Sequence, residues 1–210
     1  MSSKYDHIIL DFGGVLYNIN YHLSVVEFEK LGFEKFDEWY SQAKQHDLFD
    51  YLETGKVSEL EFYNEVRKIS GIEIKNTEIK FAWNALLIDL PVSRIELLKQ
   101  LSKRYELYLL SNTNFIHARA FRNSIDEEIG WNAFAKNFKQ VYLSHEINKR
   151  KPDINTFEFV IETNKLNRDK TLFVDDSIQH IEGAKKAGID TYFLDLKNGD
   201  SFENLFSKLM

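Results

Sequence analysis

One short segment constrains this chain more than any other, because an apolar run ends in an aspartate that two glycines closely follow. The run is His7–Leu10, the acid is Asp11, and the glycines are Gly13 and Gly14. A buried strand that ends in this way places a carboxylate at the edge of a sheet, on a turn that allows close approach to the backbone. Desolvating a carboxylate costs free energy unless a cation or a reaction uses the charge, so Asp11 is a candidate catalytic residue as well as a candidate strand-end turn.

Similar polar ends recur further along the chain. Strand-like runs end at Ser111-Asn112 and at Asp175-Asp176, and a turn between them contains Lys151-Pro152. Each pair has an ordinary interpretation when it is taken alone, since the first and last could cap helices and Pro152 could begin one. Their occurrence together and in this order indicates one shared site.

Strands and helices alternate after the first strand and a long insertion. This alternation implies right-handed crossovers and a parallel sheet that is covered on both faces. We therefore predict an α/β fold with a Rossmann-like parallel sheet core. Ligands bind at the carboxyl ends of the strands in such sheets, where Asp11, Ser111 and Asp175 are expected. The predicted strands cover residues 7–10, 106–111, 140–144, 171–175 and 191–194, and clear helical periodicity covers residues 94–101, 155–165 and 178–187.

The insertion between the first two strands is helical and rich in aromatic residues. It contains no clear strand, and Ser58 with Glu61 forms a capping-box start for one helix. We predict a core domain of residues 1–17 and 91–210 and a helical cap domain of residues 18–90, which leaves from the edge that carries the site and covers it as a lid. The helices expected in the insertion cover residues 23–31, 36–49, 58–69 and 78–87.

The composition favours a small solute as the partner. The 210 residues carry a net charge of -6 with acids and bases interspersed, which argues against binding nucleic acid or an anionic membrane surface. No apolar run approaches the roughly 20 residues that span a bilayer, and the first residues lack the pattern of a signal peptide. There are no cysteines. We therefore expect a cytoplasmic protein that is a monomer or a weak homodimer.

The charges at the predicted site require a cation. Asp11, Asp175 and Asp176 outnumber Lys151, and each like-charge pair at ~4 Å costs about 4 kcal/mol at an effective dielectric constant of ~20. Carboxylate oxygens favour Mg²⁺, and with the metal present the site could accept a phosphate dianion. Asp11 could then attack phosphorus and form an aspartyl-phosphate, while the Ser111 hydroxyl and nearby backbone N–H groups hold the other phosphate oxygens.

These motifs resemble those of the haloacid dehalogenase superfamily of hydrolases with a helical cap, and all four family motifs are present in order. The resemblance is stronger to the bacterial branch that includes alpha-D-glucose-1-phosphate phosphatase. The segments that carry this second similarity are Leu110–Asn114 with His117, Val141–Ser144, Arg150–Pro152, and Asp175-Asp176 with Ile181–Ala184.

The resemblance implies a Mg²⁺-dependent phosphatase that acts on a small phosphorylated metabolite such as a sugar phosphate. It implies that Asp11 is the nucleophile and that Lys151 balances charge during catalysis. Ser111 and Asn112, together with Lys151, would bind the phosphoryl group. The implied metal ligands are Asp11, the carbonyl of Gly13, Asp175 and Asp176.

Two positions depart from the superfamily pattern. Phosphatases of the superfamily usually carry an aspartate, acting as general acid and base, at the position of Gly13, and His180 stands where Asn or Asp is common. Two other functions therefore stay open: a haloacid dehalogenase, which also uses a nucleophilic aspartate but needs no metal, and a non-catalytic protein that binds a phosphometabolite. Retention of Asp175-Asp176 favours the phosphatase.

Overall fold

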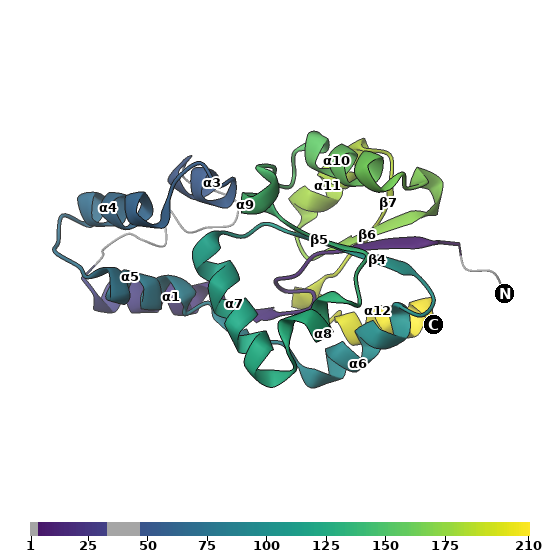
Figure 1. Cartoon of the computed structure of the whole chain (residues 1–210), viewed down its shortest axis with the longest axis horizontal. Helices are drawn as coiled ribbons and strands as arrows, with labels where there is room; N and C mark the ends of the chain where they lie inside the picture. The colour runs from purple at the N-terminus through teal and green to yellow at the C-terminus, as the bar shows by residue number, and fades with distance from the viewer. Residues whose placement is uncertain (1–3, 33–46) are drawn as a thin grey trace.

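A parallel five-stranded sheet forms the centre of the computed structural model, which describes residues 4–32 and 47–210 (Figure 1). The strand order is β5-β4-β1-β6-β7, and every neighbouring pair is parallel. The α/β fold predicted from the sequence is therefore confirmed. The strands are β1 (His7–Leu10), β4 (Glu106–Ser111), β5 (Gln140–Leu143), β6 (Thr171–Asp175) and β7 (Asp190–Phe193).

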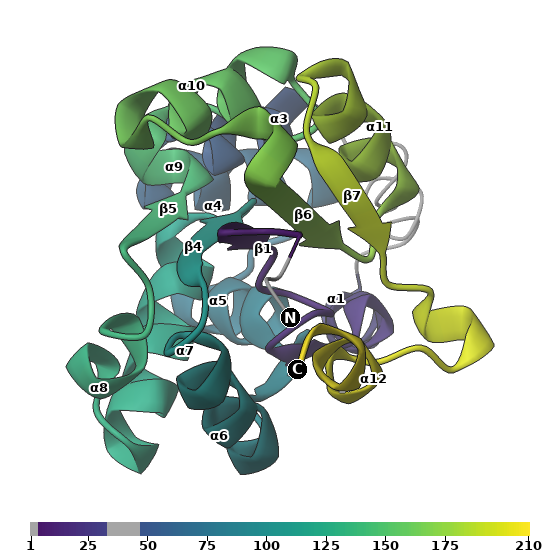
Figure 2. The ribbon, with the colours of Figure 1, turned by 90° about the vertical axis from the view of Figure 1, so that its right-hand side faces the viewer.

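Helices cover both faces of this sheet, as Figures 1 and 2 show. Ile8 and Leu10 of β1 belong to the apolar cluster on one face, whereas Ile9 between them belongs to the cluster on the other. Both faces of the strand are thus buried, as expected of a central parallel strand. One face carries α6 (Val92–Leu101), α7 (Phe115–Glu128), α8 (Trp131–Ala135) and α12 (Phe202–Leu209), and the other carries α10 (Ile154–Asn164) and α11 (Ile178–Lys186).

Three short helical segments complete the core: α9 (Ser144–Ile147), η1 (Arg168–Lys170) and η2 (Leu196–Asn198). Gly188, which follows α11, has a φ of +76° in the left-handed region that favours glycine after a helix. Within the described part of the chain, no helix combines the length and the apolar character that crossing a bilayer requires.

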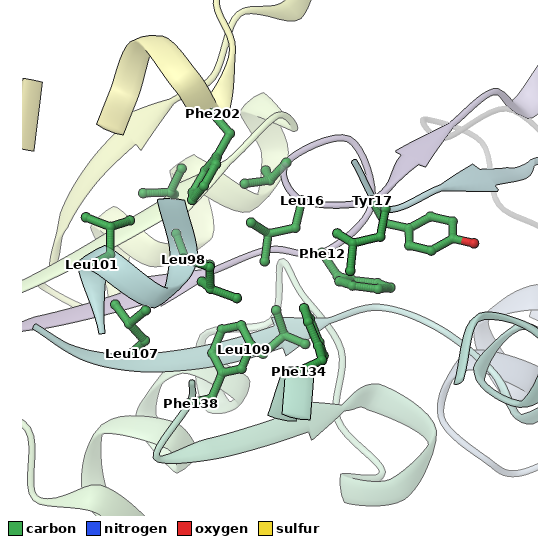
Figure 3. Packing of buried hydrophobic residues seen from close by; sticks show 14 of the residues in the cluster. Phe12, Leu16, Tyr17, Leu98, Leu101, Leu107, Leu109, Phe134, Phe138 and Phe202 are labelled. Carbon is green, nitrogen blue, oxygen red and sulfur yellow. The ribbon is translucent and has the colours of Figure 1, made fainter. Parts of the chain in front are cut away.

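The loop after β1 is anchored in an aromatic core (Figure 3). The ring centroid of Phe12 lies 4.8 Å from that of Phe121 and 5.2 Å from that of Tyr17. Phe12 is only 3% exposed, and removing a buried phenyl ring of this kind costs about 3–5 kcal/mol. This packing fixes the backbone immediately after Asp11.

A helical unit with its own apolar cluster lies beyond one end of the sheet (Figure 1). Phe28, Phe62 and Trp83 are central members of this cluster. The predicted capping box is confirmed, because Glu61 N–H donates to Ser58 Oγ and the Glu61 carboxylate accepts from Ser58 N–H. The helix predicted over residues 36–49 lies largely outside the described residues. The described helices are α1 (Tyr21–Lys30), α3 (Asp47–Glu53), α4 (Glu59–Ser70) and α5 (Asn76–Asn84).

The two connections between this unit and the sheet differ from the sequence prediction. β2 (Asn18–Ile19) and β3 (Leu87–Asp89) form an antiparallel pair where no strand was expected, and α5 ends at Asn84 rather than continuing to residue 87. Strands of two and three residues are too short to show a period in the sequence. The two strands pair because the connection that leaves the core and the connection that returns to it lie side by side.

A polar network holds these connections together. The Asn18 side-chain amide donates to Asp89 Oδ1 at 2.8 Å, and Arg94 Nη1 donates to Asn18 Oδ1 at 3.0 Å and to the Leu16 carbonyl at 3.1 Å. Arg94 Nε also contacts Glu203 Oε1 at 3.1 Å. The base of the helical unit is thereby tied to α6 and α12 of the core.

Candidate active site

The carboxyl ends of β1, β4 and β6 bring the predicted polar residues to one edge of the sheet. The backbone N–H of Asp11 donates to the Val174 carbonyl of β6, so Asp11 continues the alignment of the two strands. Asp11, Asp175 and Asp176 each place a carboxylate oxygen within 4.8 Å of the others. Ser111, only 3% exposed, ends the neighbouring strand β4.

Lys151 reaches these acids from the loop before α10. Its Nζ donates to Asp11 Oδ1 at 2.5 Å and to Asp175 Oδ2 at 2.6 Å, and the residue is fully buried. Burial alone would lower the pKa of Lys151, but the two carboxylates outweigh it and raise that pKa. The ammonium group therefore stays charged between the two acids.

Asn112 holds the backbone at Lys151. The Lys151 N–H donates to Asn112 Oδ1 at 2.9 Å, and Asn112 Nδ2 donates in return to the Lys151 carbonyl at 2.8 Å. Thr156 Oγ1 also donates to the preceding carbonyl, that of Arg150, at 2.7 Å. The side chain of Asn112, a residue predicted to bind the phosphoryl group, thus positions the backbone of Lys151 in this structure.

Asp175 is held from several sides. It accepts from Lys151 Nζ and, through Oδ1, from the N–H of Ser177 at 2.8 Å. His180 Nδ1 lies 2.9 Å from Asp175 Oδ2. Burial raises the pKa of Asp175, but the Lys151 charge and the contact with His180 outweigh burial and lower that pKa overall. His180, which stands where the superfamily commonly has Asn or Asp, therefore contacts Asp175.

Lys151 and His180 do not balance all of the negative charge of the cluster, and the excess falls on Asp176 and Asp11. Burial, reinforced by Asp11 and Asp175, raises the pKa of Asp176 to about 8. Burial likewise raises the pKa of Asp11 to about 6, despite the opposing effect of Lys151. A divalent cation would relieve this excess of negative charge, and oxygen donors of this kind are those that Mg²⁺ prefers. The donor set therefore fits Mg²⁺.

A pocket above these groups lies between the sheet edge and the helical unit. Asp11, Ser111 and Asn112 line it from the core, and Glu53 and Trp83 line it from the helical unit. Its further lining includes apolar groups, among them Ile19, Phe49, Leu86 and Leu87. Such a mixture of apolar walls and convergent polar groups is typical of a small-molecule site.

A buried network joins the two sides of the pocket. The indole of Trp83 stacks on the imidazole of His117, with ring centroids 5.0 Å apart. His117 Nε2 donates to the Trp83 carbonyl at 2.9 Å, and Nδ1 accepts from the Asn114 amide at 3.0 Å, which assigns a neutral ring. Burial lowers the pKa of His117 to about 4, in agreement with this assignment.

Several pocket residues had no assigned role in the sequence prediction. His117 belongs to one of the motifs that carry the family resemblance, but the sequence around it does not predict its contact with Trp83. Glu53, Arg150 and Gln179 also line the pocket. Their convergence depends on how the helical unit sits against the core, which local sequence patterns do not encode.

Comparison with known proteins supports the resemblance. The model of the haloacid dehalogenase-like hydrolase family matches residues 8–194. D-ribitol-5-phosphate phosphatase from Bacteroides thetaiotaomicron is 32% identical over 187 residues, which cover 89% of this chain and 90% of that protein.

Solved structures agree with this match. One similar structure is that of a HAD family enzyme from Bacteroides thetaiotaomicron, an aspartate-to-alanine mutant in complex with magnesium and inorganic phosphate. It has a TM-score of 0.86 and 29% sequence identity, and the match covers 96% of this chain and 98% of that chain. A predicted HAD-like family hydrolase from Porphyromonas gingivalis has a TM-score of 0.86 and 28% identity, covering 99% and 98%. The family match spans most of the sequence and includes every residue of the carboxylate cluster, and this chain belongs to the haloacid dehalogenase-like hydrolase family.

Proposed function

We propose that this protein is a Mg²⁺-dependent phosphatase that hydrolyses a small sugar or sugar-alcohol phosphate through an aspartyl-phosphate at Asp11. The observation that carries the proposal is the buried cluster of Asp11, Asp175, Asp176 and Lys151 at the base of a pocket. The similar D-ribitol-5-phosphate phosphatase supports the substrate class, and the similar enzyme crystallised with magnesium and phosphate supports the metal.

The proposed domain boundaries follow the apolar clusters, two of which lie in the core and one in the helical unit. Residues 1–17 and 91–210 form the core domain, which carries the chemistry, and residues 18–90 form the cap domain, which covers the substrate. The separate apolar cluster of the helical unit supports this division, as does the pairing of β2 with β3 at its base. A cap in this position excludes water from the pocket during the reaction.

The first chemical step is attack by Asp11 on phosphorus. A bond forms between a carboxylate oxygen and phosphorus while the bond from phosphorus to the ester oxygen breaks, and the departing oxygen takes up a proton from water. Water then attacks the phosphorus of the aspartyl-phosphate, which releases inorganic phosphate and restores the Asp11 carboxylate. Lys151, held against Asp11, offsets negative charge throughout.

The remaining groups bind the phosphate and the metal. The Ser111 hydroxyl holds one phosphate oxygen, and because the side chain of Asn112 is engaged by Lys151, we assign phosphoryl binding at Asn112 to its backbone N–H. When bound, Mg²⁺ neutralises the carboxylates and polarises a phosphate oxygen. Its proposed ligands are Asp11, the carbonyl of Gly13 and Asp176, with Asp175 in support.

The direct test is a phosphate-release screen across sugar phosphates, sugar-alcohol phosphates, nucleotides and acyl phosphates, with Mg²⁺ and with excess chelator. We expect turnover of sugar or sugar-alcohol phosphates that requires Mg²⁺, and alpha-D-glucose 1-phosphate in the screen tests the predicted branch. Chloride release from 2-haloacids without Mg²⁺ would indicate a dehalogenase. Saturable phosphate-ester binding without turnover would indicate a binding protein.

A further inference from the structure

Glu53 and Arg150 meet across the pocket, one from the helical unit and one from the core. Arg150 Nε lies 2.9 Å from Glu53 Oε2, and only 17% and 16% of the two side chains are exposed. Both residues line the pocket that contains Asp11. A charged pair of this kind brings a cationic donor and an anionic acceptor together beside the expected position of the substrate.

Backbone contacts position this pair next to the proposed phosphate site. Arg150 directly precedes Lys151, and Thr156 fixes its carbonyl through the hydrogen bond described above. On the other side, the Asn148 amide of the core donates to the Thr54 carbonyl at 2.9 Å, directly after Glu53 in the chain. The close packing of Gly55 against the His145 carbonyl, which a Cβ would approach to 2.5 Å, secures the same turn. Both charged groups are therefore preorganised by backbone contacts.

We propose that Glu53, positioned by Arg150, determines specificity by accepting hydrogen bonds from hydroxyl groups of the leaving alcohol. This inference rests on the proposed phosphatase function and deepens it, because it selects polyhydroxylated alkyl phosphates over plain ones. A carboxylate can accept about four hydrogen bonds, so the ion pair and hydroxyl recognition are compatible. Trp83 and Phe49, whose rings stack at 5.3 Å, give the carbon skeleton an apolar surface in the same pocket.

A different interpretation is that the pair only holds the cap against the core. Asp50 allows the two roles to be separated, since Arg150 Nη1 also contacts Asp50 Oδ1 at 2.5 Å. Asp50 does not line the pocket, and 39% of its side chain is exposed. If the pair served only as a latch that holds the cap against the core, both Asp50 and Glu53 would contribute to it. Recognition of hydroxyl groups would depend on Glu53 alone.

The test compares kcat/KM for a pentitol phosphate with kcat/KM for n-pentyl phosphate, which has the same chain length and no hydroxyl groups. We expect the wild-type protein to prefer the pentitol phosphate. Glu53→Gln should lower this preference by about 10-fold or more, because the substitution removes a charged hydrogen-bond acceptor. Its kcat/KM for n-pentyl phosphate, which has no hydroxyl group to recognise, should change little. Asp50→Asn should keep the wild-type preference.

Three outcomes would overturn the inference. One is a preference that Glu53→Gln leaves unchanged, and another is an equal loss on both esters in Glu53→Gln and Asp50→Asn, which would indicate a latch. The third is a wild-type protein that hydrolyses both esters without preference. Failure of the proposed function is distinct from all of these, because the wild-type protein would then hydrolyse neither ester in Mg²⁺.

Discussion

Gly14 and Asp176 lie so close together that a Cβ on the glycine would stand 2.2 Å from Oδ2 of the aspartate. Gly14 also has a φ of +82°, a conformation that side chains disfavour. The loop after β1 therefore packs its backbone directly against a carboxylate of the proposed metal site. No residue other than glycine fits this contact without moving Asp176.

Gly14→Ala should impair use of Mg²⁺ because the new methyl group displaces Asp176. We expect a rise in the Mg²⁺ concentration that gives half-maximal phosphate release. Gly71→Ala is the matched control, since Gly71 has a φ of +70° and no atom within 4 Å of its would-be Cβ. That control should lose about 1–2 kcal/mol of unfolding free energy and keep its Mg²⁺ dependence. The same Mg²⁺ dependence in both variants would show that the Gly14 contact is unimportant for the metal.

Lys151→Met should strongly destabilise the protein when chelator is present. The substitution leaves Asp11 and Asp175 buried without their ammonium partner, which costs about 3–5 kcal/mol of unfolding free energy. Urea unfolding measures the loss. Lys185→Met is the control, because its pair with Glu182 is half exposed and contributes at most about 1 kcal/mol. Similar small losses in both variants would contradict the buried charge network.

The buried ring of His117 should make the stability of the protein depend on pH. Its pKa is about 4 in the folded state, against about 6.5 in an unfolded chain, so the unfolded state binds the proton more tightly between these values. This contribution is fully present above pH 6.5 and falls by about 3 kcal/mol as the pH approaches 4. Comparison of the wild-type protein with His117→Gln isolates it, since all other titrating groups are shared. Parallel stability curves for the two proteins would rule out this assignment.

Gly13 should make turnover depend steeply on the leaving group. It offers no proton donor, and general acid catalysis typically contributes ~10²–10⁴-fold. Aryl and acyl phosphates should therefore react faster than alkyl phosphates, which initial rates across a series of esters measure. A Cβ at Gly13 would stand 3.0 Å from Cδ1 of Ile19, the far end of a flexible side chain, so a small shift of Ile19 accommodates Gly13→Asp, which should flatten the dependence. Gly13→Ala controls for the added bulk, and a flat dependence in the wild-type protein would mean that another group donates the proton.

Much of the core could be predicted because its signals are local. The alternation of Ile8, Ile9 and Leu10 between the two faces of β1 follows from a run that is apolar throughout. Once the sheet is parallel, Asp11 and Asp175 must end at the same edge. The capping box at Ser58 is likewise contained within a few residues.

The rest depends on contacts between distant segments. The amide of Asn112 could be placed at the site but not against the backbone of Lys151, because that contact requires the approach of two loops. The pairing of β2 with β3 involves too few residues to leave a periodic pattern. The ion pair between Glu53 and Arg150 forms because α3 packs against α9, a contact between segments far apart in the sequence.

Covalent labelling tests the assignment of Asp11 most directly. The wild-type protein, mixed with ³²P-labelled acetyl phosphate and Mg²⁺ and quenched in acid, should retain label, because the aspartyl-phosphate lacks an adjacent base at Gly13 to speed its hydrolysis. Asp11→Asn should retain none, whereas Asp169→Asn, an exposed residue of η1 at the opposite end of β6, should label like the wild-type protein. Label that persists in Asp11→Asn, or phosphate release that continues in that variant at the wild-type rate, would contradict the role of Asp11 as the nucleophile.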